Sequence, residues 1–154
     1  MSLVEGKVSL ITGAGSGIGK ATAVAFANDG AQVVCADLNF EAAQETAANI
    51  TNNGGTSLAL QLDVSDYRSA GKAVDDTVKH FGRLDVLCNI AGIGKLKHDK
   101  DETPELWHKI ISVNLTGTFY MCQHALPHLL ASKGHIVNCS SRAGTSATPW
   151  SAAY

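Results

Sequence analysis

A glycine-rich segment near the start of the sequence contains the residues whose types and spacing most directly suggest chemistry. Residues 12–20 read Thr-Gly-Ala-Gly-Ser-Gly-Ile-Gly-Lys, between a β-branched apolar run and a stretch of helical period. Such a turn lets the backbone approach a pyrophosphate, and the free N–H groups of the following helix face the anion. The spacing is not the ordinary GxGxxG, because residue 18 is Ile, nor a P-loop, because Ala21 follows Lys20. The segment predicts a dinucleotide phosphate site; the alternative is a turn without a ligand.

An acidic side chain, Asp37, ends the second apolar run twenty residues after Gly17. A carboxylate at this place can accept hydrogen bonds from the adenosine ribose hydroxyls, and it would repel a 2′-phosphate. Its neighbourhood in sequence offers no positive charge to bind such a phosphate, since the relevant residues are Ser16, Leu38 and Asn39. The sequence therefore favours NAD over NADP. The alternative is that Asp37 caps the helix that begins near Phe40.

The elements that must position these groups follow from an alternation of apolar and helical segments. Short apolar runs predict five strands, at residues 8–12, 32–36, 57–62, 84–89 and 135–138. Helical periodicity predicts helices at 18–28, 40–52 and 66–81, each followed by a glycine. A fourth helix begins at Thr103-Pro104-Glu105 and runs to about Cys122, with a break or kink near Pro127, and residues 95–102 read as a loop. The alternation predicts an α/β fold with a doubly wound parallel sheet.

Composition and charge exclude several classes of protein. The 154 residues are 45% hydrophobic and 17% charged, which fits one globular domain rather than a disordered chain. A net charge of -2 leaves no basic excess for nucleic acid or an anionic membrane. The first seven residues lack the features of a secretory signal, and no run of about 18 apolar residues occurs. We expect a cytoplasmic protein whose partner is a small molecule, with neither nucleic-acid nor membrane binding.

The cysteines and histidines do not form a metal-binding pattern. The four cysteines contain no CxxC pair and are expected to be reduced and structural: Cys35, Cys88, Cys122 and Cys139. His124 and His128 have the i, i+4 spacing of metal ligands, but residue 125 is not Glu and Pro127 lies between them. We therefore expect no metal site.

Taken together, the motifs resemble those of the classical short-chain dehydrogenase/reductase family along the whole chain. Thr12, Gly13, Gly17 and Gly19 form TGxxxGxG, which is similar to the cofactor loop of that family. Residues 89–92, Asn-Ile-Ala-Gly, resemble its NNAG motif, and residues 136–141 lead from Ser141 to Tyr154 at the family's spacing of thirteen. The resemblance implies a Rossmann fold with strand order 3-2-1-4-5 and an NAD(H)-dependent interconversion of a secondary alcohol and a ketone.

The resemblance also implies a role for individual residues. Tyr154 would be the general acid/base, Ser141 would orient the substrate oxygen, and Asn114 would hold a water in a proton relay; the alternative for Asn114 is a solvent-facing side chain. Asp63 has the alternative of belonging to a helix start capped by Ser65 or Asp66. For Asn89 and Gly92 the alternative is a turn without ligand contact. The expected cofactor contacts are Gly13, Ser16, Gly17, Ile18, Gly19, Asp37, Asp63, Val64, Asn89, Ala91, Gly92 and Tyr154.

The position of Tyr154 at the end of the given sequence shapes the remaining expectations. The family places a lysine four residues after the tyrosine, which would be residue 158. We expect residues 1–154 to be an incomplete NAD-binding domain, inactive alone, because further strands would be needed to cover the apolar strand at 135–138. The alternatives are a truncated, non-catalytic NAD-binding or interaction module and a 3-oxoacyl-thioester reductase, which usually favours NADP. A homodimer or homotetramer built partly through the fourth helix is implied by the resemblance.

Overall fold

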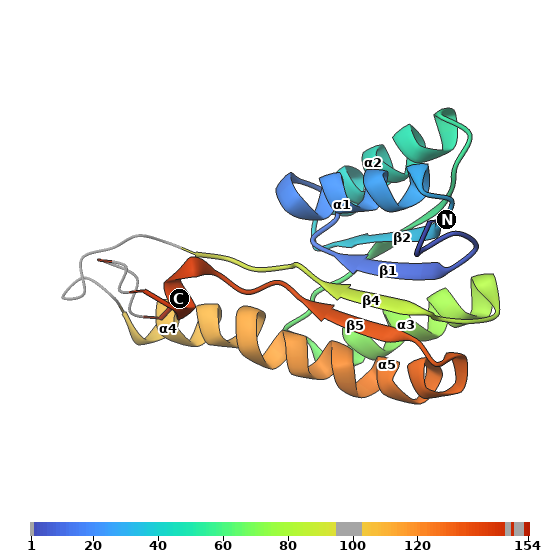
Figure 1. Ribbon diagram of the computed structural model, residues 1–154. Coiled ribbons are helices and arrows are strands. Elements are labelled where there is room, and N and C mark those ends of the chain that lie inside the picture. Colours follow the sequence, from blue (N-terminus) through green and yellow to red (C-terminus); the bar gives the residue numbers. More distant parts are fainter. Residues whose placement is uncertain (1, 95–102, 147–148, 150–152) are drawn as a thin grey trace.

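Five parallel strands form one sheet in the order β3-β2-β1-β4-β5, and helices cover both of its faces (Figure 1). The computed structural model describes residues 2–94, 103–146, 149 and 153–154, so the predicted loop at 95–102 lies outside the described residues. The strands are β1 (Val8–Thr12), β2 (Gln32–Asp37), β3 (Thr56–Gln61), β4 (Val86–Asn89) and β5 (His135–Asn138). The predicted fold class and strand order are confirmed.

The helices begin and end close to the predicted positions, except in the second half of the chain. The first three are α1 (Gly17–Asn28), α2 (Phe40–Asn52) and α3 (Tyr67–Phe81). After them come α4 (Pro104–Ile111), the π-helix η2 (Ser112–Gly117), α5 (Thr118–Ser132) and the short 3-10 helix η3 (Arg142–Gly144). None of the described helices combines the length and the apolar character that a membrane crossing requires.

The predicted break near Pro127 is wrong. Pro127 lies inside α5, and the helical path is disturbed instead at η2, which contains Asn114. Proline removes one backbone donor, but here the helix continues to Ser132 despite this loss. Gly117 at the end of η2 allows the close approach of the loop after β3, since a Cβ at Gly117 would lie 2.8 Å from Val64 Cγ2. The irregular turn therefore lies where the helix meets that loop.

Two separate cores pack against the sheet. Leu10 and Ile11 are neighbours in β1 and both are fully buried, but Leu10 packs with α3 and α5 whereas Ile11 packs with α1 and α2. This alternation is what a parallel sheet with helices on both faces requires. β5, by contrast, is hydrogen-bonded to β4 alone among the described strands, and Ile136 and Val137 are 37% and 51% exposed. The expected exposed apolar strand is therefore present in this chain.

Asp85 joins the amino edge of the sheet, where β4 approaches the start of β1. Its side chain is buried; Oδ2 accepts hydrogen bonds from Val8 N at 3.0 Å and Arg83 Nε at 2.8 Å, and Lys7 Nζ lies 3.9 Å from Oδ1. Burial by itself raises the pKa of Asp85. Hydrogen bonds from Arg83 and Val8 and the charges of Arg83 and Lys7 outweigh this effect and hold that pKa below its usual range. The Asp85 carbonyl also accepts from His135 N at 2.8 Å, so the same residue joins β1 and β5 to β4.

Candidate functional site

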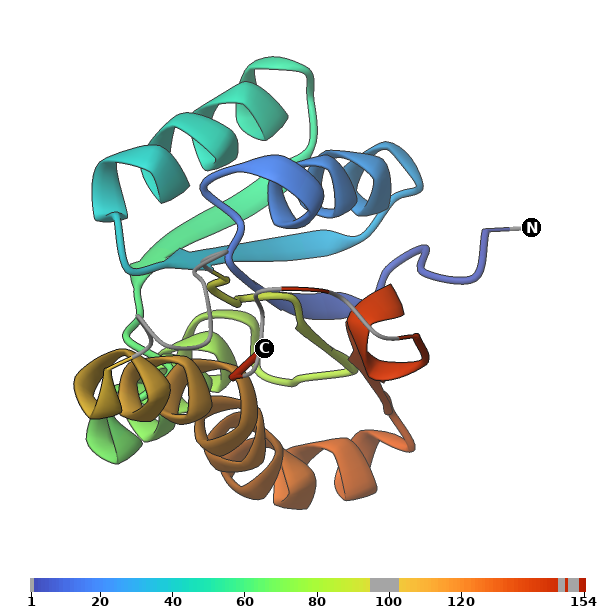
Figure 2. The same cartoon turned by 90° about the vertical axis from the view of Figure 1, so that its left-hand side faces the viewer.

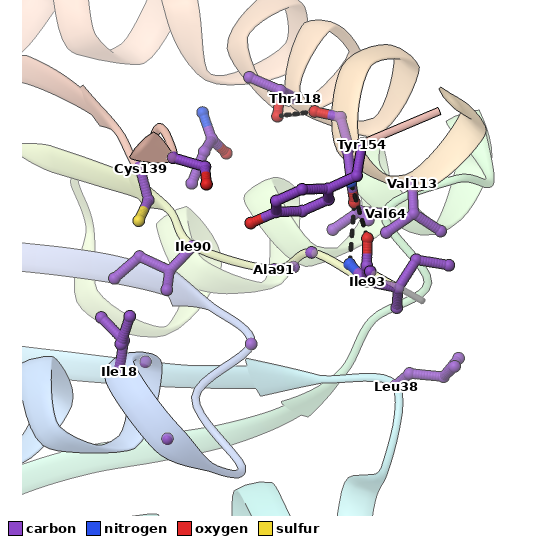
Figure 3. A pocket seen from close by; sticks show the side chains of 18 of the residues that line it. Ile18, Leu38, Val64, Ile90, Ala91, Ile93, Val113, Thr118, Cys139 and Tyr154 are labelled. Atoms are coloured by element: carbon purple, nitrogen blue, oxygen red, sulfur yellow. Dashed lines mark hydrogen bonds between the residues drawn. The ribbon is translucent and has the colours of Figure 1, made fainter. Parts of the chain in front are cut away.

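A cavity of about 960 Å³ opens at the carboxyl edge of the sheet, where the loops after the strands meet η2 (Figure 3). Open parallel sheets bind ligands at this edge. Every residue that the sequence predicts for the site lines this one cavity, although the residues come from seven different segments. They are Gly13, Ser16, Gly17, Ile18, Gly19, Asp37, Asp63, Val64, Asn89, Ala91, Gly92, Asn114, Ser141 and Tyr154.

The glycine-rich loop between β1 and α1 has the geometry of an anion site. Gly13 and Gly17 have φ values of 69° and 51°, in the left-handed region that favours glycine. A Cβ at Gly13 would lie 2.9 Å from Ala91 Cα, and one at Gly19 would lie 2.1 Å from Gly13 O, so the loop packs too closely for side chains. Ser16 precedes α1 without a side-chain cap, which leaves the first N–H groups of the helix available to a ligand. The loop therefore fits the phosphates of a dinucleotide.

Asp37 is fixed at the end of β2 by two backbone donors. Gly15 N donates to Oδ2 and Asn39 N donates to Oδ1, each at 2.9 Å. The cap of α2 is Asn39, whose side chain accepts from Ala42 N at 3.2 Å. Asp37 is therefore not the cap of that helix. Its carboxylate is held beside the glycine loop, in the wall of the cavity.

Asp63 and the start of α3 show both of the arrangements that the sequence left open. The side chain of Asp66 caps α3 by accepting from Ser69 N at 2.6 Å. Asp63 Oδ1 accepts from the backbone N–H of Ser65 at 2.9 Å and from its hydroxyl at 2.6 Å, while Asp63 remains in the cavity wall. The helix cap and the cavity residue are thus different aspartates.

Two side chains hold the segment that follows β4. Thr12 Oγ1 accepts from Ile90 N and Ala91 N, both at 3.0 Å. The amide of Asn114 bonds the backbone of Ile93 twice at 2.8 Å: Ile93 N donates to Oδ1, and Nδ2 donates to Ile93 O. Asn114 is therefore not a solvent-facing side chain. Thr12 was visible as part of the glycine motif, whereas no sequence signal links Asn114 to a residue twenty-one positions earlier.

Asn89 ends β4 in a largely buried position. Its Nδ2 donates to Asn138 Oδ1 at 2.8 Å and to Cys122 Sγ at 3.3 Å. Its Oδ1 is buried and has no hydrogen-bond partner among the described residues. Burial raises the pKa of Cys122, and the hydrogen bond from Asn89 opposes that shift. The carboxyl end of β4 thus keeps an unused acceptor near the cavity.

Ser141 and Tyr154 approach the cavity from different segments. Ser141 caps η3, where its Oγ accepts from Ala143 N at 3.2 Å. The chain ends between the helix α4 and the turn η3 (Figure 2). From there the Tyr154 ring extends across the cavity, with its hydroxyl on the side of Cys139 and away from Val113 (Figure 3). The arrangement places two hydroxyl groups in one cavity, where they can meet a substrate oxygen.

The cysteines divide into buried and accessible groups. Burial raises the pKa of Cys35 to about 12 and that of Cys88 to about 11, as expected for structural thiols. Cys139 is exposed and lines the cavity, so the expectation that all four cysteines are structural is wrong for this residue. Of the two spaced histidines, His124 has its Nε2 3.0 Å from the carbonyl of Tyr67. This contact joins the side chain of His124 in α5 to the backbone of Tyr67 in α3.

Comparisons with known proteins give a consistent result. The family model described as short chain dehydrogenase matches residues 7–154. D-threitol dehydrogenase of Mycolicibacterium smegmatis is 40% identical over 152 residues, which are 98% of this chain and 58% of that protein. The 2,5-dichloro-2,5-cyclohexadiene-1,4-diol dehydrogenase LinX of Sphingobium indicum is 43% identical, covering 98% of this chain and 61% of its own length.

Solved structures give the same picture. The crystal structure of a short chain dehydrogenase from Mycobacterium avium superposes with a TM-score of 0.91 at 34% identity, over 100% of this chain and 60% of that one. The chain therefore spans about three fifths of the length of the proteins that it matches.

Proposed function

Because this chain belongs to the short-chain dehydrogenase family, we propose that it supplies the cofactor-binding and catalytic side chains of an NAD(H)-dependent oxidoreductase. The reaction would interconvert a secondary alcohol and a ketone. The observation that carries the proposal is the meeting of the glycine loop, Asp37, Ser141 and Tyr154 in one cavity. A bound nicotinamide dinucleotide would supply the hydride acceptor or donor for this reaction.

The cavity offers separate groups to the two halves of such a cofactor. The uncapped first turn of α1 and the loop around Gly13 would bind the phosphates through backbone N–H groups. Asp37 would accept hydrogen bonds from the ribose hydroxyls. Asp63 and Val64 would contact the adenine, and the segment at 89–92 would lie against the cofactor at the end of β4. The close approach of Gly13 to Ala91 brings these two segments together.

The state of Asp37 supports NAD rather than NADP. Both carboxylate oxygens already accept backbone hydrogen bonds, from Gly15 and Asn39, so the side chain is held in place. A 2′-phosphate at this position would meet a fixed negative charge, and like charges at close range are unfavourable.

Binding measurements test this part of the proposal. Wild-type protein should bind NADH more tightly than NADPH, and Asp37→Ala should weaken NADH binding about tenfold, the effect of losing hydrogen bonds to a charged group. Fluorescence titration with both nucleotides measures the two affinities. Tighter binding of NADPH by the wild-type protein would contradict the choice of NAD.

The hydroxyl groups of Tyr154 and Ser141 would carry the proton chemistry. Tyr154 would give its proton to, or take one from, the substrate oxygen, and Ser141 would hold that oxygen by a hydrogen bond. Asn114 would support the site by holding Ile93. Ile93 engages Oδ1 and Nδ2 of Asn114 with one hydrogen bond each, so a relay water would use the remaining lone pair or N–H of that amide, or a backbone atom of the same residue.

Replacing the tyrosine tests the catalytic part. With a panel of secondary alcohols and NAD, Tyr154→Phe in the full protein should lower kcat by about 100-fold or more, the usual contribution of a general acid/base. NADH affinity should stay within about twofold, because the ring is retained. Tyr120→Phe is the matched control, since Tyr120 packs edge-on against Tyr67 at a ring distance of 5.1 Å. Unchanged turnover in Tyr154→Phe would contradict the assignment of Tyr154 as the general acid/base.

A homo-oligomer is part of the same proposal. Large apolar side chains are exposed along η2 and α5: Leu115 is 65%, Phe119 58% and Leu130 71% exposed. Exposed apolar surface on this scale marks association surfaces. Light scattering of the full protein tests the expectation of a dimer or tetramer, which a monomer at micromolar concentration would contradict.

A further inference from the structure

Gly94 lacks a side chain at the place where the ring of Tyr154 lies. A Cβ on Gly94 would be 3.2 Å from Tyr154 Cδ2, 3.4 Å from Cε2 and 3.6 Å from Cγ, which is tighter than ordinary van der Waals contact at the nearest atom. Gly13 and Gly17 have positive φ values, but Gly94 does not. The backbone conformation of Gly94 is therefore open to other residues, and what the glycine provides is space for the ring.

The backbone beside Gly94 is fixed by contacts of its own. Ile93 is hydrogen-bonded twice by the amide of Asn114, and Ala91 donates to Thr12 Oγ1. The backbone could therefore not shift to make room for a side chain at Gly94 without breaking these hydrogen bonds. The phenol ring is the more mobile partner, because its residue is 49% exposed.

Contact with Gly94 constrains one edge of the Tyr154 ring, the edge that carries Cδ2 and Cε2. No described residue forms a hydrogen bond with the Tyr154 hydroxyl. Figure 3 shows the ring lying across the cavity from the Val113 side, with its oxygen toward the Cys139 side. A shift of the ring edge at Gly94 would move this oxygen, which must stay within hydrogen-bond reach of the proton that it exchanges.

We propose that Gly94 is a positioning residue for the Tyr154 phenol, kept free of a side chain so that the hydroxyl reaches the substrate oxygen. This inference rests on the proposed function of Tyr154. It concerns the orientation of the acid/base; the groups proposed to bind the phosphates and the adenosine ribose, the glycine loop and Asp37, lie on other segments of the cavity wall.

A graded series of substitutions in the full protein tests the proposal. Gly94→Ala should lower kcat about fivefold and Gly94→Val about fiftyfold, because small misplacements of a catalytic group are costly. The Kd for NADH should stay within about twofold in both variants, as uniform binding is untouched. Ala48→Val on the exposed face of α2, outside the cavity, is the control for an added side-chain volume. Retention of wild-type kcat in Gly94→Val, within twofold, would overturn the proposal.

A second measurement does not depend on turnover. Labelling the full protein with 3-fluorotyrosine includes the three tyrosines of this chain, Tyr67, Tyr120 and Tyr154, and Tyr154→Phe assigns the ¹⁹F resonance of the last. Gly94→Ala should shift the Tyr154 resonance and leave those of Tyr67 and Tyr120 in place. An unmoved Tyr154 resonance would overturn the inference about Gly94. A different result would separate the two proposals. If Tyr154→Phe kept its turnover while Gly94→Ala shifted the Tyr154 resonance, the catalytic role of Tyr154 would be contradicted, but the contact between Gly94 and the ring would be supported.

Discussion

The side chains of Asp85 and Asn89, at opposite edges of the same sheet, satisfy their polar atoms in opposite ways. At the amino edge, the buried carboxylate of Asp85 receives its hydrogen bonds from Val8 and Arg83, within the protein. At the carboxyl edge, Asn89 Oδ1 has no partner among the described residues and Ser16 leaves α1 uncapped. Unpaired buried polar groups cost about 1 to 3 kcal/mol each. Asp85 thus stabilises the amino edge, whereas Asn89 and the first turn of α1 keep hydrogen-bonding capacity at the carboxyl edge.

The largest effect that separates the two edges is expected from Asp85→Ala. Removing the carboxylate leaves Val8 N unpaired and Arg83 without its partner, which should lower the free energy of unfolding by about 3 kcal/mol. NADH affinity should not change, because Asp85 lies at the edge opposite the cavity. Urea unfolding measures the loss, and Asp75→Ala on the exposed face of α3 is the control. An equal loss in both variants would contradict the role of Asp85.

The reverse pattern is expected from Gly19→Ala at the carboxyl edge. Its Cβ would lie 2.1 Å from Gly13 O, so the loop must move away from its present path. NADH binding should weaken by about 100-fold, because the N–H groups of the loop no longer converge on the phosphates. Fluorescence titration gives the affinity. Wild-type affinity in this variant would show that the loop does not bind the cofactor.

The stabilisation that Asp85 contributes at the amino edge should depend on pH. The pKa of Asp85 is lower in the folded protein than its ordinary value, so its stabilising effect is present above the pKa of the unfolded chain, about 4. The effect is lost as the pH falls toward the folded-state pKa. The difference in unfolding free energy between wild type and Asp85→Asn should therefore be full at pH 7 and shrink below pH of about 4. A difference independent of pH would exclude a charged Asp85 as its source.

The smallest effect is expected at the end of α5, next to the amino edge. Lys133 has a φ of 53°, in the left-handed region where side chains are strained. Lys133→Gly should raise the free energy of unfolding by about 0.5 to 1 kcal/mol, with no change in NADH affinity. Thermal unfolding measures the gain. A loss of stability would indicate that the lysine side chain contributes contacts that outweigh the strain.

Most of the fold could be predicted because its signals are local. The apolar runs place β1 and β5 at the bounds that the structure shows, and glycines mark the ends of the first helices. The predicted start of the fourth strand is two residues early: β4 begins at Val86, although Asp85 N already donates to Val8 O and Asp85 O accepts from His135 N. The π-helix at η2 could not be predicted, since it coincides with a contact between Asn114 and Ile93 that no sequence pattern announces.

Sequence motifs singled out the residues of the candidate site but not the contacts that hold them in place. Motif spacing singled out Asp37, Ser141 and Tyr154, and all three line one cavity. What it could not provide was the support of these groups: that Gly15 holds Asp37, or that Gly94 makes room for the Tyr154 ring. Such contacts depend on the path of loops from different strands, and a glycine shows in the sequence only that a side chain is absent.

The alternation of Leu10 and Ile11 between the two cores has a consequence for changes in chain length. Inserting or deleting one residue within β1 would exchange the faces of all following side chains in the strand, so that each core would receive the partners of the other. Thr12 would then present its hydroxyl to the wrong side and lose Ile90 and Ala91. An insertion or deletion should therefore be tolerated in the loops but not within β1, whose alternating side chains link both cores to the cavity.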